Sequence, residues 1–429
     1  MSFRKCTNSE YGIGLRYYLT DTDGTGGRLK SEAADFVVRE ISSRPEPSGD
    51  GQFAIADVTS TNWETNRLVR LLSRSIGMSR ERIGFAGTKD KRAVTTQLMS
   101  FQCPAEHLSR VDLKDVDISN VYRARRGIQI GDLVGNAFDI TVKECASIDP
   151  DNISSISSEI SSTGGFPNYF GVQRFGAARP ITHIVGERIV RGDLEGAVYA
   201  YLSQPSEFEM GEITEARKLL RDDLSAAVAV MPKTMSFEKI MAEHLIKRPG
   251  DYAGAILCLP SNLQMMFVHA YQSYLFNLML SRRMELGLPI NAPVPGDVVI
   301  PLDSDGNPVH ERPTVTTDRN LDLVAKQVRK KRAYVSITLF GSESTFSEGE
   351  MGDIEESIVR GEGIGNEDFM VTGLPNCSSK GSRREILCPV NNLSYSVHDD
   401  NYVMSFSLSK GNYATCLMRE FMKSYMERY

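Results

Sequence analysis

A single aspartate, Asp90, stands among cations in the segment GTKDKR. Its neighbours are Lys89, Lys91 and Arg92. Nearby positive charge favours the ionised form of a carboxyl group, so we expect Asp90 to be charged at neutral pH. An ionised carboxylate can attack or stabilise an electron-poor sugar carbon, as in glycosidases. The alternative is that Asp90 forms a purely structural ion pair with Lys89 or Arg92.

Enzymes that break glycosidic bonds normally use a second carboxylic acid to protonate the leaving group. No such acid is evident near Asp90 or in the aromatic segment FPNYFGVQRFG at residues 166–176. A leaving group that needs little protonation, such as a uracil anion, fits this pattern better. Tyr169 and Phe170 could stack on a base and Asn168 could bind its edge, or all three could pack in a core. Because chemistry on a stacked base requires its extrusion, the two segments together suggest a base-extruding RNA enzyme.

The sequence lacks the motifs of several common enzyme classes. It contains no Gly-Lys-Ser/Thr phosphate loop, no G-x-S-x-G elbow and no H-E-x-x-H helix. Its seven Cys and six His are scattered without zinc-ligand spacing. We therefore expect reduced thiols, no bound metal and no organic cofactor.

The 49 Lys and Arg and 55 Asp and Glu give a net charge of −6. This balance argues against nonspecific coating of nucleic acid, but a local basic groove is enough to bind RNA. No run of about 18 apolar residues and no apolar leader is present, so we expect a cytoplasmic protein without a membrane span. Nothing in the sequence indicates an obligate partner, and we expect a monomer.

The elements around Asp90 can be predicted from local patterns. Short β-rich runs predict strands at 36–38, 51–58, 83–86 and 94–101, which places Asp90 on a loop between the last two. Thr61 and Glu64 fit a capping box that begins a helix, and Gly77 suits its end. The basic face of that helix is either solvated or directed at phosphates, and consists of Arg67, Arg70 and Arg74.

The rest of the chain alternates between helical and strand patterns. Residues 127–142 predict a β-hairpin with turns at Gly131-Asp132 and Gly135-Asn136. Helical patterns occupy 188–241 and 263–286, and residues 288–320 read as loops. The basic run KQVRKKR at 326–332 is either a solvated face or an RNA contact. Strands and a final helix follow, so the order suggests a domain interrupted by an insertion.

The Asp90 segment and the aromatic segment resemble those of the TruD family of tRNA pseudouridine synthases. The segment GFAGTKDKRAVTTQ is similar to the family signature G-x-K-D-x-x-A-x-T-x-Q. Five further blocks resemble the family in the same order, almost from end to end of the chain: DFVVREI, GDLVGNAFDITV, PNYFGVQRFG, HAYQSYLFN and LSKGNYATCLMREF.

The resemblance implies an α+β fold with a mixed, mainly antiparallel catalytic sheet. The catalytic domain would comprise residues 1–186 and 371–429, interrupted by a helix-rich α/β insertion at 187–370. The activity implied is isomerisation of a uridine in tRNA to pseudouridine, at position thirteen in bacterial members and at a wider range of targets elsewhere. The implied partner is tRNA.

The resemblance also implies roles for individual residues. Asp90 matches the essential aspartate, and Phe170 falls where this family has Phe instead of an active-site Tyr. Asn168 matches an active-site asparagine, and Lys30 matches a lysine near the aspartate. The residues that we expect to contact RNA are Arg67, Arg70, Arg74, Lys89, Lys91, Arg92 and Arg174.

Two other interpretations remain open from the sequence. The first is a noncatalytic tRNA-binding or RNA-folding module on the same scaffold, although such a module gains nothing from an acid among phosphate-facing cations. The second is a nucleoside hydrolase or another glycosyl-transferring enzyme. The lack of an evident second carboxylate and the basic helix face argue against it.

Overall fold

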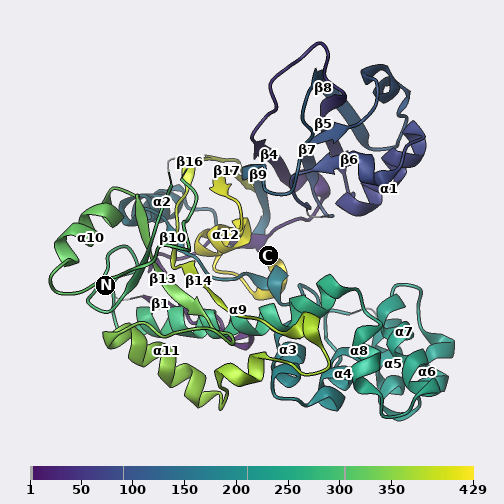
Figure 1. Cartoon of the computed structure of the whole chain (residues 1–429). Coiled ribbons are helices and arrows are strands. Elements are labelled where there is room, and N and C mark those ends of the chain that lie inside the picture. Colours follow the sequence, from purple (N-terminus) through teal and green to yellow (C-terminus); the bar gives the residue numbers. More distant parts are fainter. Residues whose placement is uncertain (1–2, 90, 210, 304–305) are drawn as a thin grey trace. The chain divides into compact units, whose positions relative to one another are not determined.

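The computed structural model describes residues 3–89, 91–209, 211–303 and 306–429. The chain folds into two compact units, each assembled from segments far apart in sequence (Figure 1). We call the first the helical unit; it comprises Met1–Asp21, Phe166–Leu387 and Tyr425–Glu427. We call the second the sheet unit; it comprises Thr22–Gly165, Cys388–Ser424 and Arg428–Tyr429.

The sheet unit is built on a nine-stranded sheet within the described part of the chain. Its strand order is β16-β17-β9-β4-β7-β5-β8, with β3 paired to β9 and β6 to β7. The strands are β3 (Gly26–Arg28), β4 (Phe36–Ser42), β5 (Phe53–Thr61), β6 (Ile83–Phe85), β7 (Val94–Phe101), β8 (Val116–Ala124), β9 (Leu133–Cys145), β16 (Asn391–Val397) and β17 (Tyr402–Ser409). Only β4 and β7 run parallel among the described pairs, which confirms the predicted α+β class with a mixed, mainly antiparallel sheet.

Alternate residues of β5 enter different cores on the two faces of this sheet. Ala54 and Val58 pack in a cluster with Leu68 and Leu72 of helix α1 (Thr65–Ile76), whereas Ile55 belongs to a second cluster. This alternation is the expected result of a period of two along a strand. The sheet unit also contains α2 (Pro150–Thr163) and α12 (Ala414–Met422).

The start of α1 differs from the prediction. Thr61 is the last residue of β5, and Glu64 is the N-cap, with its carboxylate accepting hydrogen bonds from the backbone N–H groups of Asn66 and Arg67 at 2.9 Å. A carboxylate there satisfies free donors and also interacts favourably with the helix dipole, so no threonine is needed. The predicted end is confirmed, because Gly77 adopts a left-handed conformation with φ of +74°.

The predicted hairpin at 127–142 is wrong in its second turn. A turn precedes Asp132, but β9 runs straight through Gly135-Asn136 and pairs with β4 on one side and β17 on the other. Gly135 is required for a different reason. A Cβ atom at this position would collide with the carbonyl oxygen of Leu408 on β17, so only glycine permits the close approach.

Helices dominate the helical unit: α3 (Thr182–Val190), α4 (Leu194–Ser203), α5 (Gly211–Asp222), α6 (Leu224–Val230), α7 (Ser236–Lys247), α8 (Tyr252–Leu257), α9 (Ser261–Glu285), α10 (Leu321–Arg329) and α11 (Gly349–Gly361). The long helix α9 confirms the prediction at 263–286 and packs against α3 and α11. Its residue Arg283 is fully buried and donates two hydrogen bonds to Asp297, at 2.6 and 2.8 Å, and two to the carbonyl oxygen of Pro289.

A smaller sheet of order β12-β11-β13-β14 lies in the helical unit. Its strands are β11 (Val298–Pro301), β12 (Thr314–Val315), β13 (Ala333–Leu339) and β14 (Ser382–Glu385). Residues 288–320 are therefore not all loop, because the buried run Val298-Val299-Ile300 is central to this sheet. A two-stranded sheet of β1 (Arg4–Lys5) and β2 (Tyr17–Tyr18) lies in the same unit, and the remaining short strands are β10 (Phe166–Pro167) and β15 (Leu387–Cys388).

The limits of the two compact units do not coincide with residues 187 and 370, where we expect the family-specific insertion to begin and end. Compact packing and an insertion in a family are different properties, so the insertion at 187–370 stays a prediction. Within the described part of the chain, no helix combines the length and the apolar character needed to cross a bilayer.

Candidate active site

The predicted catalytic residue, Asp90, lies outside the described residues, but the loop before it is firmly held. The backbone N–H of Lys89 donates to the hydroxyl of Thr65 at 2.9 Å. That hydroxyl donates to the Gln97 side chain at 3.2 Å, and the Gln97 amide donates to the carbonyl oxygen of Gly87 at 2.7 Å. Thr65 and Gln97 are buried, so these bonds connect the loop to the start of α1 and to β7 in a place shielded from water.

The side chain of Lys89 adds a second anchor for the loop. Its ammonium lies 2.6 Å from the carboxylate of Glu40 on β4, and both side chains are at most 5% exposed. Ser42 also donates to Glu40, at 2.5 Å. Lys89 is therefore paired and buried inside the sheet unit, unlike the exposed cations with which the sequence analysis grouped it.

Glu40 is a functional candidate that the sequence analysis missed. We found no acid near Asp90 in the sequence, yet the structure places the Glu40 carboxylate next to the same loop. The available signal was its position in the block DFVVREI, where Arg39 and then Glu40 follow the two valines of a predicted strand. Because Glu40 accepts hydrogen bonds from Lys89 and Ser42, its place suits holding the loop.

Lys30 lies in a segment to which the Asp90 loop is connected. Arg92 lies two residues beyond Asp90 in the sequence. Its guanidinium donates to the carbonyl oxygen of Ser31, the residue after Lys30, at 3.0 Å. The Lys30 ammonium lies 4.2 Å from the centre of the Phe36 ring, and its backbone has φ of +55°. Such a left-handed conformation is uncommon for a lysine and persists only where surrounding contacts determine it.

The basic face of α1 is on the surface of the sheet unit. Arg67, Arg70 and Arg74 are exposed, opposite the buried Leu68 and Leu72. None of the three arginines forms an ion pair within the described residues, and Arg67 lies over the Trp63 ring at 5.5 Å. Lys91 and Arg92 are exposed as well. These cations remain accessible to an anionic ligand.

The aromatic segment belongs to the helical unit and is held by two buried amides. The Asn277 side chain on α9 accepts from the backbone N–H of Phe170 at 2.9 Å and donates to its carbonyl oxygen at 3.1 Å. Asn168 donates its side-chain amide to the carbonyl oxygen of Glu385 at 2.9 Å. It accepts a hydrogen bond from Arg384 at 2.6 Å. The backbone of this segment is thus fixed on both sides.

Two guanidinium groups flank the ring of Phe170. Arg384 lies 4.3 Å and Arg174 lies 5.4 Å from the ring centre, and Phe276 meets the ring edge-on at 5.4 Å. The ring is 3% exposed. Arg384 was not singled out in the sequence, because RRE on a short strand carries no local sign of a contact with residue 168. The group combines positive charge with an aromatic ring, but a residue that is 3% exposed leaves little ring surface on which a base could stack.

The predicted residues therefore fall into two groups. Asn168, Phe170 and Arg174 come together in the helical unit with Arg384. In the sheet unit, Lys89 pairs with Glu40, and Arg92 on the same loop bonds the backbone of Ser31, the residue after Lys30. The cations of α1 are joined to the second group through Thr65, which binds the Lys89 backbone.

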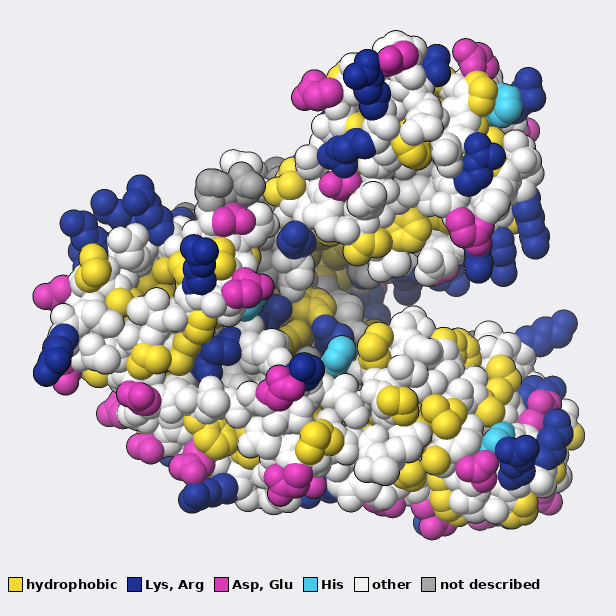
Figure 2. All heavy atoms as spheres, in the orientation of Figure 1, with side chains coloured by type: hydrophobic (Ala, Val, Ile, Leu, Met, Phe, Trp, Pro, Cys, Tyr) yellow, Lys and Arg dark blue, Asp and Glu magenta, His cyan; other side chains and the backbone are white. Residues whose placement is uncertain are grey.

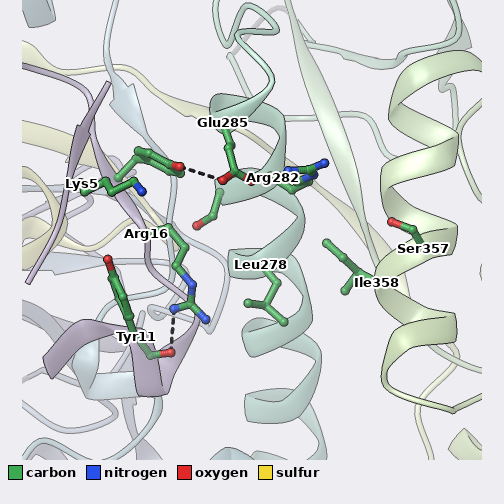
Figure 3. Close-up of a pocket in the computed structure, with 10 residues that line it drawn as sticks. Lys5, Tyr11, Arg16, Leu278, Arg282, Glu285, Ser357 and Ile358 are labelled. Atoms are coloured by element: carbon green, nitrogen blue, oxygen red, sulfur yellow. Dashed lines mark hydrogen bonds and ion pairs between the residues drawn. The ribbon is translucent and has the colours of Figure 1, made fainter. Parts of the chain in front are cut away.

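A cavity of about 410 Å³ in the helical unit contains none of the predicted residues. Figure 3 shows it between the N-terminal segment, α9 and α11. The Glu285 carboxylate at its wall accepts hydrogen bonds from Tyr17 and Arg282, at 3.1 and 2.5 Å. These contacts lower the pKa of Glu285, with Arg282 as the largest cause. Arg282 and Glu285 at this wall are thus paired with each other.

In the described residues, no group of three or more His, Cys, Asp and Glu side chains is arranged to hold a metal ion. The seven Cys side chains are free thiols. Burial raises the pKa of Cys377, the most enclosed of those with a shifted pKa, to about 11. Thiols with so high a pKa are poor nucleophiles at neutral pH.

The chain was compared with known families, curated proteins and solved structures. The family model described as tRNA pseudouridine synthase D (TruD) matches residues 12–421. A probable tRNA pseudouridine synthase D of Methanosarcina mazei is 38% identical over 96% of this chain and 97% of its own length. The corresponding protein of Methanococcoides burtonii is 40% identical over 97% of both chains. That of Pyrococcus furiosus is 35% identical over 96% of this chain and 99% of its own.

A solved structure shows the same similarity in three dimensions. The crystal structure of the putative tRNA pseudouridine synthase D from Methanosarcina mazei superimposes with a TM-score of 0.86. It is 37% identical in sequence, and the match covers 99% of this chain and 100% of that one. The arrangement of strands and helices described above is therefore shared with that protein.

Proposed function

This chain belongs to the TruD family of tRNA pseudouridine synthases, and from this premise we propose that it isomerises a uridine of tRNA to pseudouridine with Asp90 as the catalytic carboxylate. The observation that carries the proposal is the family match over residues 12–421, which includes the Asp90 loop and the aromatic segment. Members of such a family share chemistry when they share site residues, and this chain has the expected residue at each position singled out above.

The anchoring of the Asp90 loop supports a catalytic role for its tip. Thr65, Gln97 and the Lys89–Glu40 pair hold the part of the loop before Asp90 through buried contacts. A catalytic carboxylate is effective only when its position is fixed relative to the reacting carbon. We therefore assign Lys89 to positioning the loop and leave the phosphate contacts to exposed cations, which are Arg67, Arg70, Arg74, Lys91 and Arg92.

The reaction begins with a uridine turned out of its RNA stack. Asp90 assists cleavage of the bond between C1′ and N1, either by attack at C1′ or by deprotonating the sugar, and N1 keeps the bonding electrons. The uracil then rotates and its C5 bonds to C1′. C5 loses its proton to a base and N1 gains one, so the product is an isomer of the substrate. No co-reactant is consumed.

The remaining residues have supporting roles in this proposal. Phe170 stacks on the uracil in this proposal, which requires Arg384 or Arg174 to move away from its ring, because the residue is 3% exposed here. Asn168 holds the segment or binds the base edge. Lys30 orients Asp90 or offsets its charge. Arg174 and Arg384, at 5.4 and 4.3 Å from the Phe170 ring, bring positive charge to the same segment. The target is the uridine at position thirteen, and the enzyme acts in the cytoplasm as a monomer.

The isomerisation can be tested with tRNA carrying tritium at C5 of uridine. We expect purified protein to release tritium and to leave pseudouridine at the target position. EDTA should not reduce the rate, because the proposed steps need no metal. If tritium is released while the sum of uridine and pseudouridine in the tRNA stays constant, no base has been lost and hydrolysis is excluded. A protein that binds tRNA but releases no tritium would instead be the noncatalytic module, and the proposal would be rejected.

Replacing Asn168 by alanine should slow the reaction about tenfold to a hundredfold, because small displacements of positioned groups have effects of this size. The variant loses the charge-assisted bond from Arg384 and the bond to the Glu385 carbonyl oxygen. The same loss should lower the free energy of unfolding by roughly 1–3 kcal/mol. Single-turnover rates and denaturant unfolding measure the two effects.

The control is Asn262→Ala, which makes the same change at an exposed position on α9. It should leave rate and stability close to those of the parent protein. Equal rates in the two variants would contradict a role for Asn168.

A further inference from the structure

A basic surface at the end of α10 is not used by the function proposed above. We call it the α10 patch; its members are Lys326, Arg329, Lys330, Lys331 and Arg332. We propose that the α10 patch binds backbone phosphates of the substrate RNA, outside the site where the uridine reacts. This proposal rests on the proposed function for the identity of the RNA.

The helix presents its cations on one side. Val324 and Val328 are buried against the rest of the helical unit, whereas Lys326, Arg329 and Lys330 are exposed. Residues at i, i+3 and i+4 lie on the same face of a helix, so these three side chains project together from the face opposite the valines. Figure 2 shows Lys and Arg side chains gathered in the region that α10 occupies in Figure 1.

The turn after the helix is closed by two backbone hydrogen bonds and continues the patch. The N–H of Lys331 donates to the carbonyl oxygen of Val328 at 2.8 Å, and the N–H of Arg332 donates to that of Gln327 at 3.0 Å. This is the Schellman arrangement, in which the residue at the left-handed position is usually glycine. Here that residue is Lys331, with φ of +54°. A lysine therefore stands where the backbone favours a residue without a side chain.

The cations of the α10 patch have no acidic partners within the described residues. None of the five forms an ion pair there, although paired surface cations are common in the same unit. The pairs include Lys218–Glu215, Arg360–Glu356 and Lys380–Glu343. The helix dipole favours cations in a last turn, but it does not account for unpaired cations beyond the helix.

The α10 patch is a concentrated positive surface in a chain whose net charge is −6. Among the seven residues 326–332 it contains five cations without an ion pair in the described part of the chain. Such a surface attracts a polyanion and releases its counterions on binding. The patch contains no aromatic side chain that could stack on a base, and lysine and arginine on an exposed helix end suit phosphate groups. We infer contacts with the RNA backbone that are independent of sequence.

The test replaces Lys326, Lys330 and Lys331 together by glutamine, which removes charge and keeps most of each side chain. The affinity for tRNA is measured between about 50 and 200 mM salt. The logarithm of the association constant falls linearly with the logarithm of the salt concentration. Each lost phosphate contact should make this slope less steep by about 0.7–0.9, so three losses should make it less steep by roughly 2 to 3. KM for tRNA should rise at least tenfold at the lowest salt, whereas kcat at saturating tRNA should stay unchanged.

The matched control replaces Lys218, Arg360 and Lys380 by glutamine, with the same change of charge at ion-paired positions of the same unit. Its slope should stay within about 1 of the parent value. An equal slope change in the two triple variants would show a general charge effect and overturn the proposal. An unchanged slope in the α10 variant, with normal product formation by the parent, would also overturn it.

Two further measurements keep the outcomes separate. If the triple variant unfolds early in thermal denaturation, Lys330→Gln alone should still reduce the slope by about 0.7–0.9. If the parent protein makes no pseudouridine yet the patch variant loses salt-dependent affinity, the α10 patch is confirmed as an RNA surface and the proposed reaction is rejected.

Discussion

Asp90→Asn is expected to reduce pseudouridine formation by a factor on the order of 10³ or more, the scale seen when an essential nucleophile is removed. The amide has nearly the shape of the carboxylate but carries no negative charge, so it can neither attack C1′ nor remove a proton from the sugar. Affinity for tRNA should change less than about twofold, because binding depends on cations and on the aromatic segment. Tritium release and filter binding measure the two quantities.

The control for this variant is Asp50→Asn in the same unit. Asp50 is an exposed carboxylate whose hydrogen bonds with Arg125 lower its pKa. Its replacement removes an equal charge and should leave the rate unchanged. Activity of Asp90→Asn near that of the parent protein would contradict the catalytic role, and a parallel loss of binding and rate would indicate a damaged fold.

The second large effect is expected at Arg283 on α9. Arg283→Met should lower the free energy of unfolding by about 3–5 kcal/mol, because it leaves a buried charge without its partner. Both Arg283 and Asp297 have side chains that are 0% exposed, and the guanidinium also binds the carbonyl oxygen of Pro289 twice. Denaturant unfolding of the helical unit, followed by circular dichroism, measures the change.

The neighbouring residue provides the comparison. Arg282 pairs with Glu285 at 2.5 Å, but both side chains are more than two-fifths exposed, so Arg282→Met should cost less than about 1 kcal/mol. The double variant Arg283→Met with Asp297→Leu should recover much of the loss, since no buried charge remains. Equal effects of the two single variants would mean that the buried pair is not the source of stability.

Elements with a strong local pattern could be predicted from sequence. The strand at 94–101 and the long helix at 263–286 were predicted correctly from composition. The first is rich in Val, Thr and Phe, which favour strands, and the second is a long run rich in Leu and Met without Gly or Pro. Gly135 could not be interpreted in this way. Glycine occurs both in turns and where two strands come close, and only the position of Leu408 on a distant strand distinguishes the two.

The candidate site was predictable in residue type but not in its contacts. The Asp90 loop and the aromatic segment stand out by composition and by resemblance to the family. The contact between Lys89 and Glu40 joins residues 49 apart, and that between Arg384 and Asn168 joins residues 216 apart. No local pattern encodes a pair of this kind, so both Glu40 and Arg384 were missed.

The order of strands in the main sheet has a consequence for synthesis on the ribosome. β17 pairs along β9, and Ser405 reaches Asp139 across 266 residues of chain. At about 5–20 residues per second, a nascent chain must wait on the order of 10–50 s before this edge of β9 acquires its neighbour. During that interval a long strand edge is open to wrong pairing, so protection by a chaperone during translation would benefit this protein.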